Sequence, residues 1–347
     1  MRTVPARVIV AVLLLLAACG SEDSDGLPAC PKPITSKVVA PGLAGQIAFK
    51  TTGLPEPGYY HCSEIFVINA DGSGLRKVTT EPETYPFDVR RSPVGGLYVY
   101  WGACPDVQNF ELCLVNEDGT DRRPLSAGSG HVGTTEDDSP AWSPDGSKIV
   151  FRRRPDNGPG TSSGPGDLYI VGVDGTGETR LTNEPADESQ PAWSPDGQTI
   201  AYISNEGTKQ VRVVKASGGP STVLAPGGTV NESPSFSHDG RRIAFSSNRG
   251  GKPDSAYTER VRQSPGSEEL PRSGAHDIYV VGVDGKGLTR LTSDASASYS
   301  PEWSPDDRHI AFVSDRDDTH SPYVMAADGT NVVRLAPLEA SSLNWFR

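Results

Sequence analysis

The sequence is short of sulfur-containing residues and of basic charge. Of its 347 residues only two are Met and five are Cys, and 44 acidic residues outnumber 32 Lys and Arg, which gives a formal net charge of −12. A negative balance of this size argues against nucleic acid as a partner and against charge-driven binding to anionic lipid. Its ordinary consequence is solubility. The 38 Gly and 30 Pro make the chain rich in turn formers but not disordered in composition.

Long apolar runs are also lacking. The run Val8–Ala18 follows Arg2 and Arg7 and is too short to span a bilayer. A positive start, an apolar stretch and small residues before a cleavage point are typical of a secretion signal. The tail L-A-A-C, which ends at Cys19, resembles a bacterial lipobox. This resemblance implies that residues 1–18 are a signal peptide and that Cys19 carries a lipid; an ordinary signal with a chance cysteine is the alternative.

A lipid on Cys19 would hold the protein at a membrane surface without spanning it. We therefore expect an extracytoplasmic lipoprotein of the cell envelope, with residues 19–43 as the lipidated cysteine and a linker. Gly20, not Asp, follows the cysteine. The lipobox resemblance then implies the outer membrane in a Gram-negative host and the outer side of the cell membrane in a Gram-positive one, and the sequence does not decide between the two hosts.

The four other cysteines predict disulfides, since cysteines outside the cytosol usually pair. Cys104 and Cys113 enclose a ten-residue segment and are a natural pair, which leaves Cys30 to pair with Cys62. Metal binding is the alternative, but the spacing lacks the C-x-x-C pattern of a zinc site. The sequence alone does not fix the connectivity.

One phrase is repeated along the chain. P-A-W-S-P-D-G occurs at 140–146 and again at 191–197, with looser copies at 234–240 and 301–307. Each copy opens a longer unit that continues with an apolar strand, a variable loop, a second strand, a D-G turn and a closing Leu. A catalytic site is normally built once, so four copies indicate a structural unit.

These units predict an all-β fold. The runs are short, rich in β-branched and aromatic residues and bounded by Gly, Pro, Asp and Ser, and no stretch keeps a helical period. In S-P-D-G, Pro presets φ, Asp can bond to its own backbone and Gly takes the strained position. The strands are almost continuously apolar, which is typical of sheets covered on both faces. Four such strands per unit indicate a β-propeller.

The ends of the chain indicate how the ring closes. The first unit begins near Gly45 with no P-x-W phrase, and Trp345 falls 42 residues after Trp303, where the next such tryptophan would stand. The C-terminal segment then supplies the inner strand of the first blade, a 1+3 closure. The sequence thus predicts a six-bladed propeller over 44–347, with blades at 44–80 plus 341–347, 84–127, 137–183, 188–225, 231–292 and 298–337.

The repeat resembles the TolB-like (WD40-like) β-propeller family. The matching residues are Trp142, Trp193 and Trp303 with their S-P-D-G turns and the D-G segments downstream. Members are periplasmic six-bladed proteins that bind an outer-membrane lipoprotein and carry an N-terminal α/β domain. This sequence has a lipobox and a linker in that place, so the resemblance implies the propeller and not the family's partner.

The repeat turns make one face of the propeller uniform, so we expect function on the other face, where the loops vary. The variable segments are 51–63, 102–110, 152–166 and 249–276. Four acids precede the third strand of their blades at one offset and could form a ring that binds cations or cationic peptides, or could be structural bridges: Glu64, Glu111, Asp167 and Asp277. Three histidines would lie on the same face, where surface loops are the ordinary explanation for them: His131, His276 and His320.

The sequence favours a binding module over an enzyme. We expect non-covalent binding of a protein, a peptide or an envelope glycan by a monomer, with no cofactor, no catalytic residue and no resident metal. The alternative is a propeller enzyme, a polysaccharide lyase or hydrolase with a metal on the loop face, because oligogalacturonate lyase-type propellers use one. The identity of the partner is beyond the sequence.

Overall fold

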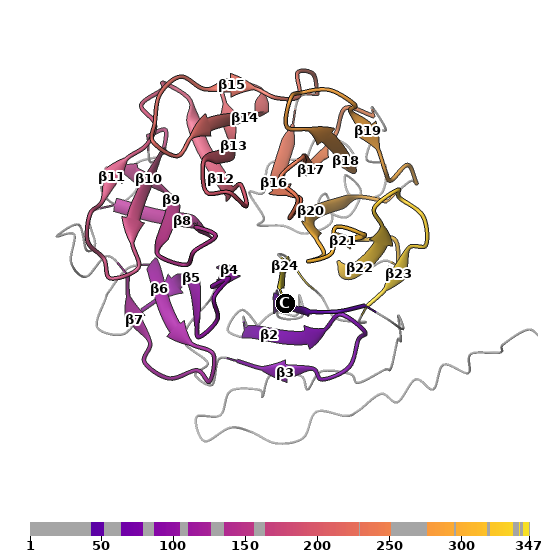
Figure 1. The fold of residues 1–347 in the computed structure, drawn as a ribbon, viewed down its shortest axis with the longest axis horizontal. Helices are drawn as coiled ribbons and strands as arrows, with labels where there is room; N and C mark the ends of the chain where they lie inside the picture. Colours follow the sequence, from indigo (N-terminus) through magenta and orange to yellow (C-terminus); the bar gives the residue numbers. More distant parts are fainter. Residues whose placement is uncertain are drawn as a thin grey trace, which may run out of the picture. The chain divides into compact units, whose positions relative to one another are not determined.

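The repeated units fold as a ring of small sheets. The computed structural model describes residues 43–51, 64–78, 87–104, 110–125, 135–155, 164–228, 230–250, 276–294, 296–317, 320–335, 340 and 343–346. In these residues 24 strands form six antiparallel sheets of four strands each, arranged around a central axis (Figure 1). The predicted six-bladed, all-β propeller is confirmed. The described part of the chain contains no helix long and apolar enough to cross a membrane.

Each blade takes its four strands in order from the axis outward. The first three blades consist of β24 (Leu343–Phe346), β1 (Gln46–Thr51), β2 (Glu64–Asn69) and β3 (Arg76–Lys77); β4 (Phe87–Arg91), β5 (Leu97–Ala103), β6 (Phe110–Asn116) and β7 (Arg123–Pro124); and β8 (Thr135–Trp142), β9 (Lys148–Pro155), β10 (Asp167–Gly172) and β11 (Thr179–Arg180). The other three consist of β12 (Asp187–Trp193), β13 (Thr199–Asn205), β14 (Lys209–Lys215) and β15 (Thr222–Val223); β16 (Asn231–Phe236), β17 (Arg242–Ser247), β18 (Asp277–Gly282) and β19 (Thr289–Arg290); and β20 (Ser298–Trp303), β21 (His309–Ser314), β22 (Ser321–Ala326) and β23 (Val333–Arg334).

The ring is closed by pairing between segments almost 300 residues apart. β24 lies antiparallel to β1, with Trp345 opposite Ile47 and Leu343 opposite Phe49. Trp345 is 4% exposed, and its Nε1 donates to the carbonyl oxygen of Ala44 at 3.1 Å. The predicted 1+3 closure is therefore confirmed.

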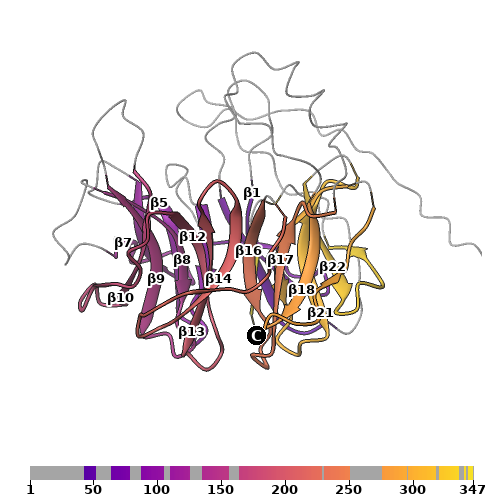
Figure 2. The same cartoon turned by 90° about the horizontal axis from the view of Figure 1, so that it is seen from above.

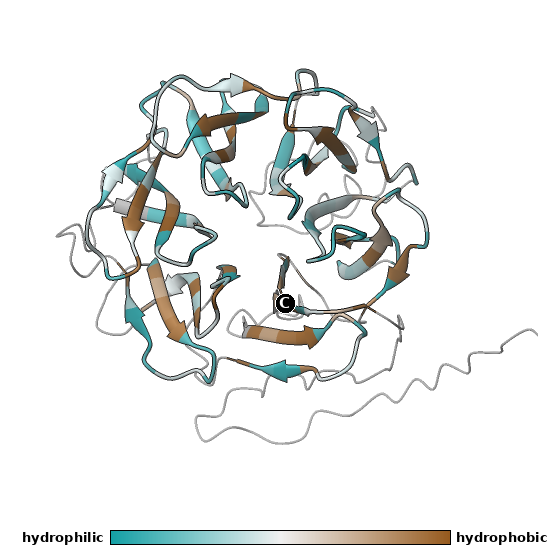
Figure 3. Cartoon of the chain, in the orientation of Figure 1, coloured by the Kyte–Doolittle hydropathy of each residue, from teal (hydrophilic) through white to brown (hydrophobic). Residues whose placement is uncertain are grey.

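Neighbouring blades bury their middle strands against each other. The described core consists of six apolar clusters, each of which combines residues of two adjacent blades. Between blades three and four, for example, Val150 and Ile170 pack with Ile200 and Val214. This two-sided burial explains why the strands do not alternate with polar residues. In Figure 3 the middle strands β2 and β6 are hydrophobic, whereas the short outer strands β3 and β7 are hydrophilic.

Antiparallel order gives the propeller two different faces. The strands run between these faces, as the side view in Figure 2 shows. The turns from first to second strand and from third to fourth strand lie on one side, which we call the turn face. The connections from second to third strand, and from one blade to the next, lie on the other side, the loop face. Of the variable segments expected there, 52–63, 105–109, 156–163 and 251–275 lie outside the described residues.

Candidate functional site

The inner strands of five blades carry the same backbone irregularity. In blade three the pairing with β9 skips between Asp138 and Ala141, and Ser139 lies between them with a φ of 53°. Such a bulge with a left-handed residue bends a strand and redirects the side chains beside it. The other four blades repeat this at one position each, with φ values from 46° to 54°: Asp88, Gln190, Ser233 and Ser300.

These bulges surround a cavity on the propeller axis, which we call the waist. It has a volume of about 130 Å³ and receives residues from all six inner strands, among them Asp88, Ser139, Gln190, Ser300 and Leu343. Left-handed backbone in non-glycine residues costs free energy, and it is retained where the surrounding structure enforces it. The bulges therefore give the axial cavity its shape.

A wider cavity of about 420 Å³ opens from the waist toward the turn face, and we call it the funnel. The waist and the funnel share Arg90, Pro191, Pro234 and Glu302 in their walls. The aromatic residues of the repeated phrase also line the funnel: Trp142, Trp193, Phe236 and Trp345. Blade six is different, since its Trp303 is 1% exposed and Arg242 covers the ring at 4.3 Å from the centroid.

The funnel is asymmetric. The middle residue of P-x-W faces it in every blade, and in each blade this residue pairs with the centre of the second strand. Blades three to five have small residues there, whereas blades six, one and two have large polar ones. In ring order from the first blade the residues are Asn344, Arg90, Ala141, Ala192, Ser235 and Glu302.

Glu302 is the acidic group in the wall of the funnel. Ser235 Oγ donates to its Oε2 at 3.2 Å, and Arg90 Nη1 lies 4.0 Å from Oε1. Arg90 Nη1 also donates to the carbonyl oxygen of Leu343 at 2.8 Å. Burial raises the pKa of Glu302, and the opposing charge of Arg90 limits the rise. The funnel thus combines aromatic and small apolar walls with one acid, Glu302, and with the basic side chains of Arg90, Arg91 and His238.

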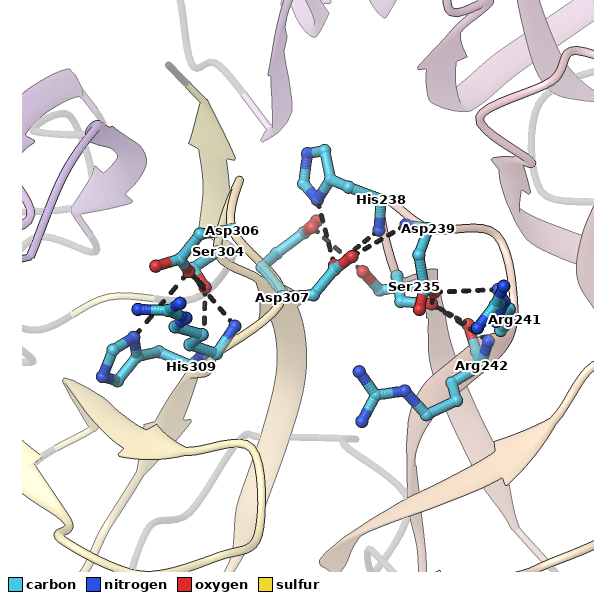
Figure 4. A network of polar contacts seen from close by, with 12 residues as sticks. Ser235, His238, Asp239, Arg241, Arg242, Ser304, Asp306, Asp307 and His309 are labelled. Atoms are coloured by element: carbon cyan, nitrogen blue, oxygen red, sulfur yellow. Dashed lines mark hydrogen bonds and ion pairs between the residues drawn. The ribbon is translucent and has the colours of Figure 1, made fainter.

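The S-P-D-G turns have the structural role that the sequence predicts. In blade three, Asp145 accepts hydrogen bonds from Ser143 Oγ at 2.6 Å and from the N–H of Ser147 at 3.0 Å. These bonds lower the pKa of Asp145 to about 2, with the Ser143 bond contributing most. In the fifth and sixth blades the turns are joined to each other through Asp307 and His238, as Figure 4 shows.

The four acids expected on the loop face stand at the start of third strands, and two of them bridge to the fourth strand of their own blade. Asp167 lies 2.6 Å from Arg180, and Asp277 lies 2.5 Å from Arg290 and accepts a bond from Thr292. Burial raises the pKa of Asp167, and Arg180 opposes the rise. Glu111 is buried, and the side chain of Glu64 lies outside the described residues. This geometry fits the structural reading, and a binding role for the acids stays a prediction.

The expected histidines do not form a group within the described residues. His276 is buried, and its carbonyl oxygen accepts the N–H of Ser298. His320 is exposed and meets Tyr299 edge-on at 5.7 Å between ring centroids. His131 lies outside the described residues. Within those residues no three His, Cys, Asp or Glu side chains are grouped as metal ligands. The enzyme alternative stays a prediction.

One of the two expected disulfides can be seen. Cys104 and Cys113 are bonded, with their Cα atoms 5.7 Å apart, and both are buried between blades one and two. Cys30 and Cys62 lie outside the described residues, as does Cys19.

Sequence reasoning missed the funnel, because it interprets the tryptophans of the repeat only as strand residues. Their recurrence on one inner strand was the signal that could have indicated it.

Comparison with known proteins agrees with this architecture. Residues 137–265 match the model of the TolB beta propeller domain. A TolB homolog of Chlorobium chlorochromatii is 30% identical over 177 residues, which cover 49% of this chain and 32% of that relative's length. The chain thus matches about a third of that protein.

Solved structures show the same fold. TolB from Acinetobacter baumannii superposes with a TM-score of 0.65 at 16% identity, covering 88% of this chain and 68% of the other. A putative TolB from Agrobacterium tumefaciens gives a TM-score of 0.59 at 20% identity, covering 88% and 99%. The repeat, the ring closure and these matches together show a β-propeller that is similar to the TolB propeller domain.

Proposed function

We propose that this protein is an extracytoplasmic, lipid-anchored binding module that holds a segment of a partner protein in the funnel. The observation that carries the proposal is the funnel itself, a concave cavity whose wall combines aromatic and small apolar side chains with several polar groups, and ligand sites are usually concave and combine these two kinds of group. It is built on the inner strands and on the tight turns that follow them, and not on the variable loops, so its shape is preformed. A rigid site loses little conformational entropy when a partner binds.

The lining favours a peptide segment over other ligands. Trp193 is half-buried and so presents part of its indole to the cavity, next to the small side chain of Ala192. An apolar side chain fits such a wall, and aromatic residues are common anchors in protein interfaces. Glu302 and Arg90 provide hydrogen-bonding groups for a peptide backbone. The TolB-like fold supports a protein-interaction module, and an envelope glycan is the competing ligand.

The proposed location rests on the N-terminal sequence. The apolar run Val8–Ala18 and the L-A-A-C tail support export and a lipid on Cys19, and the similarity to TolB proteins is consistent with a place outside the cytoplasm. Incorporation of labelled palmitate by the wild-type chain, and its loss in Cys19→Ser, would support the anchor. Equal labelling of the two chains would contradict it.

Photo-crosslinking in native envelopes tests the site. The variant Ala192→Arg fills the funnel with a long side chain, and Val283→Arg is its matched control, because Val283 is 41% exposed on the turn face and does not line the funnel. We expect wild type and the control to capture the same proteins and Ala192→Arg to lose them, with equal melting temperatures. Capture of these proteins by Ala192→Arg at the wild-type level would exclude the funnel as the binding site.

The same experiment examines the loop face. The double variant Asp167→Asn, Asp277→Asn removes two acids that form ion pairs with Arg180 and Arg290. If the acids are structural, the melting temperature falls and capture persists at low temperature. Loss of capture at an unchanged melting temperature would instead place the binding site on the loop face.

A further inference from the structure

Blades five and six place an arginine in the same way at the loop face. Their second strands end in S-N-R and S-D-R, so that Arg249 and Arg316 are equivalent residues. In both, the Nε donates to the Oγ of the serine two residues earlier, at 3.1 and 3.2 Å. Each guanidinium lies 4.8–5.2 Å from the centroids of two aromatic rings of its own blade: Phe245 and Tyr279 in blade five, Phe312 and Tyr323 in blade six.

The two arginines differ in their counter-ion. In blade six, Arg316 lies 3.3 Å from Asp294, which is the third residue after the closing Leu of the blade before it. Glu184 stands at the same offset after the closing Leu of blade three, and it lies 3.8 Å from Arg212. At this offset after blade four the chain has Gly227. The acid that meets an arginine at two other blade junctions is therefore missing beside Arg249.

Arg249 makes contacts with neutral groups. Its Nη2 donates to the carbonyl oxygens of Ala225 and Gly227, at 3.4 and 3.0 Å, and to Asn231 Oδ1 at 3.0 Å. Among the described residues its Nη1 has no acceptor and no carboxylate pairs with it. Burial lowers the pKa of Arg249, and Tyr279 opposes the fall. A half-buried guanidinium without a counter-ion is costly to the fold.

The surroundings leave this charge uncompensated and leave room beside it. The nearest described acids have cations of their own, since Asp277 lies 2.5 Å from Arg290 and Glu232 lies 2.5 Å from Lys209. A Cβ on Gly227 would meet nothing within 4 Å. Open space thus adjoins the guanidinium at the residue where the other junctions carry a carboxylate.

The chain itself indicates which ligand fits. At the equivalent place Asp294 and Glu184 each present a side-chain carboxylate to an arginine. A carboxylate matches the fork of a guanidinium, and the resulting hydrogen bonds are charge-assisted. An acidic side chain from another polypeptide would reproduce the contact that blade five lacks.

We propose that Arg249 binds a carboxylate of a second polypeptide, an acidic side chain of a partner protein that takes the place Asp294 has in the next blade. The site lies on the loop face, away from the funnel, and does not depend on the function proposed for the funnel. The contacts with Ser247 and Asn231 hold the guanidinium in place, so that its Nη1 faces the ligand.

Titration calorimetry on the purified full-length chain tests the proposal with triglutamate and triglutamine, each blocked at both ends. We expect triglutamate to bind, with an affinity that falls as salt rises, and triglutamine not to bind. Arg249→Gln should weaken triglutamate binding about 10-fold or more, because a charge-assisted hydrogen bond is lost. Arg316→Gln is the matched control: it makes the same change at the equivalent residue, where Asp294 already occupies the guanidinium, and should bind as wild type does.

A pair of substitutions at Gly227 supplies the missing acid within the chain. Asp and Asn have the same size, and both tolerate left-handed backbone better than most residues. Gly227→Asp should abolish triglutamate binding and should melt at a higher temperature than Gly227→Asn, which should retain binding. Equal behaviour of the two variants would mean that Arg249 needs no counter-ion.

Four results would overturn the proposal. Equal affinity of wild type and Arg249→Gln, or of triglutamate and triglutamine, would remove the role of the charge. Tighter binding of a glucuronic acid trimer would make the ligand an acidic glycan. Absence of triglutamate binding at millimolar concentration would exclude the site. Binding that appears only in Glu268→Gln, Glu269→Gln would make the chain's own segment 251–275, which lies outside the described residues, the source of the carboxylate.

Discussion

Asp307 accepts hydrogen bonds from the backbone N–H groups of His238, at 2.6 Å, and of Asp239, at 2.8 Å, and so joins blade six to blade five (Figure 4). Both partners are exceptions to the repeated phrase. His238 stands where the other full copies have proline, and Asp307 stands where they have glycine. Between blades three and four, the glycine of one phrase lies against the proline of the phrase before it: a Cβ on Gly197 would lie 3.7 Å from Pro144. The two exceptions therefore meet at one interface.

A double-mutant cycle measures this coupling. Asp307→Gly removes an acceptor for two N–H groups but relieves a left-handed backbone, φ 59°, so we expect a net loss of about 1 kcal/mol. In the Asp307→Gly background, His238→Pro restores the proline and the glycine of the repeated phrase. It should therefore lower the free energy of unfolding by less than it does in the wild-type chain. Urea unfolding of the four proteins should show a coupling of about 1 kcal/mol. Additive effects within about 0.3 kcal/mol would mean that the contact contributes nothing.

Glu188 should make stability depend on pH. Its side chain is fully buried between blades three and four, and burial raises its pKa from 4.5 to about 7, against a hydrogen bond from Thr182. Because the folded pKa is raised, the unfolded chain loses the proton first as pH increases. Stability therefore falls between about pH 4.5 and pH 7 and is level above that range. The corresponding loss of stability is about 3 kcal/mol.

The variant Glu188→Gln isolates this effect. We expect it to match wild type in urea unfolding near pH 4.5 and to be more stable at pH 8. Glu206→Gln makes the same change of charge at an exposed position and should leave the pH profile of wild type unaltered. If the stability of Glu188→Gln still falls between pH 4.5 and pH 7, groups other than Glu188 cause that decline.

Removal of the closing tryptophan should weaken the whole ring. Trp345 packs in the cluster between blades one and six, and truncation of a buried Trp to Ala typically costs about 3–5 kcal/mol. We expect Trp345→Ala to lose that amount in urea unfolding, with Val94→Ala, 69% exposed, as the neutral control. A loss below about 1 kcal/mol would show that β24 is not needed for closure.

The disulfide between Cys104 and Cys113 should make a moderate contribution to the free energy of unfolding. Chain-entropy arguments for a loop of this length give about 2–3 kcal/mol. The double variant Cys104→Ser, Cys113→Ser should lose this stability. Dithiothreitol should then have no further effect on the variant's stability unless Cys30 and Cys62 are also paired. A remaining response to dithiothreitol in that variant would therefore report the second predicted bond.

The fold could be predicted because its signals are local and repeated. The Ser143–Asp145 pair of the turn recurs at the same offset in four blades, and the spacing to Trp345 indicates the closure. The cavities could not be predicted this way. Trp193 and Trp303 are the same residue type, and both follow an inner-strand bulge, yet Trp193 lines the funnel and Trp303 is covered by Arg242.

The pairing of β24 with β1 also sets the order in which the molecule can be completed. Until residues 343–346 are in place, β1 exposes the backbone hydrogen-bonding groups of its inner edge, next to the apolar side chains of Ile47 and Phe49. An open edge of this kind is a template for another chain. A molecule whose last strand is missing or displaced would then be prone to take the equivalent strand of a neighbour, and the usual product of incomplete closure would be a strand-exchanged oligomer.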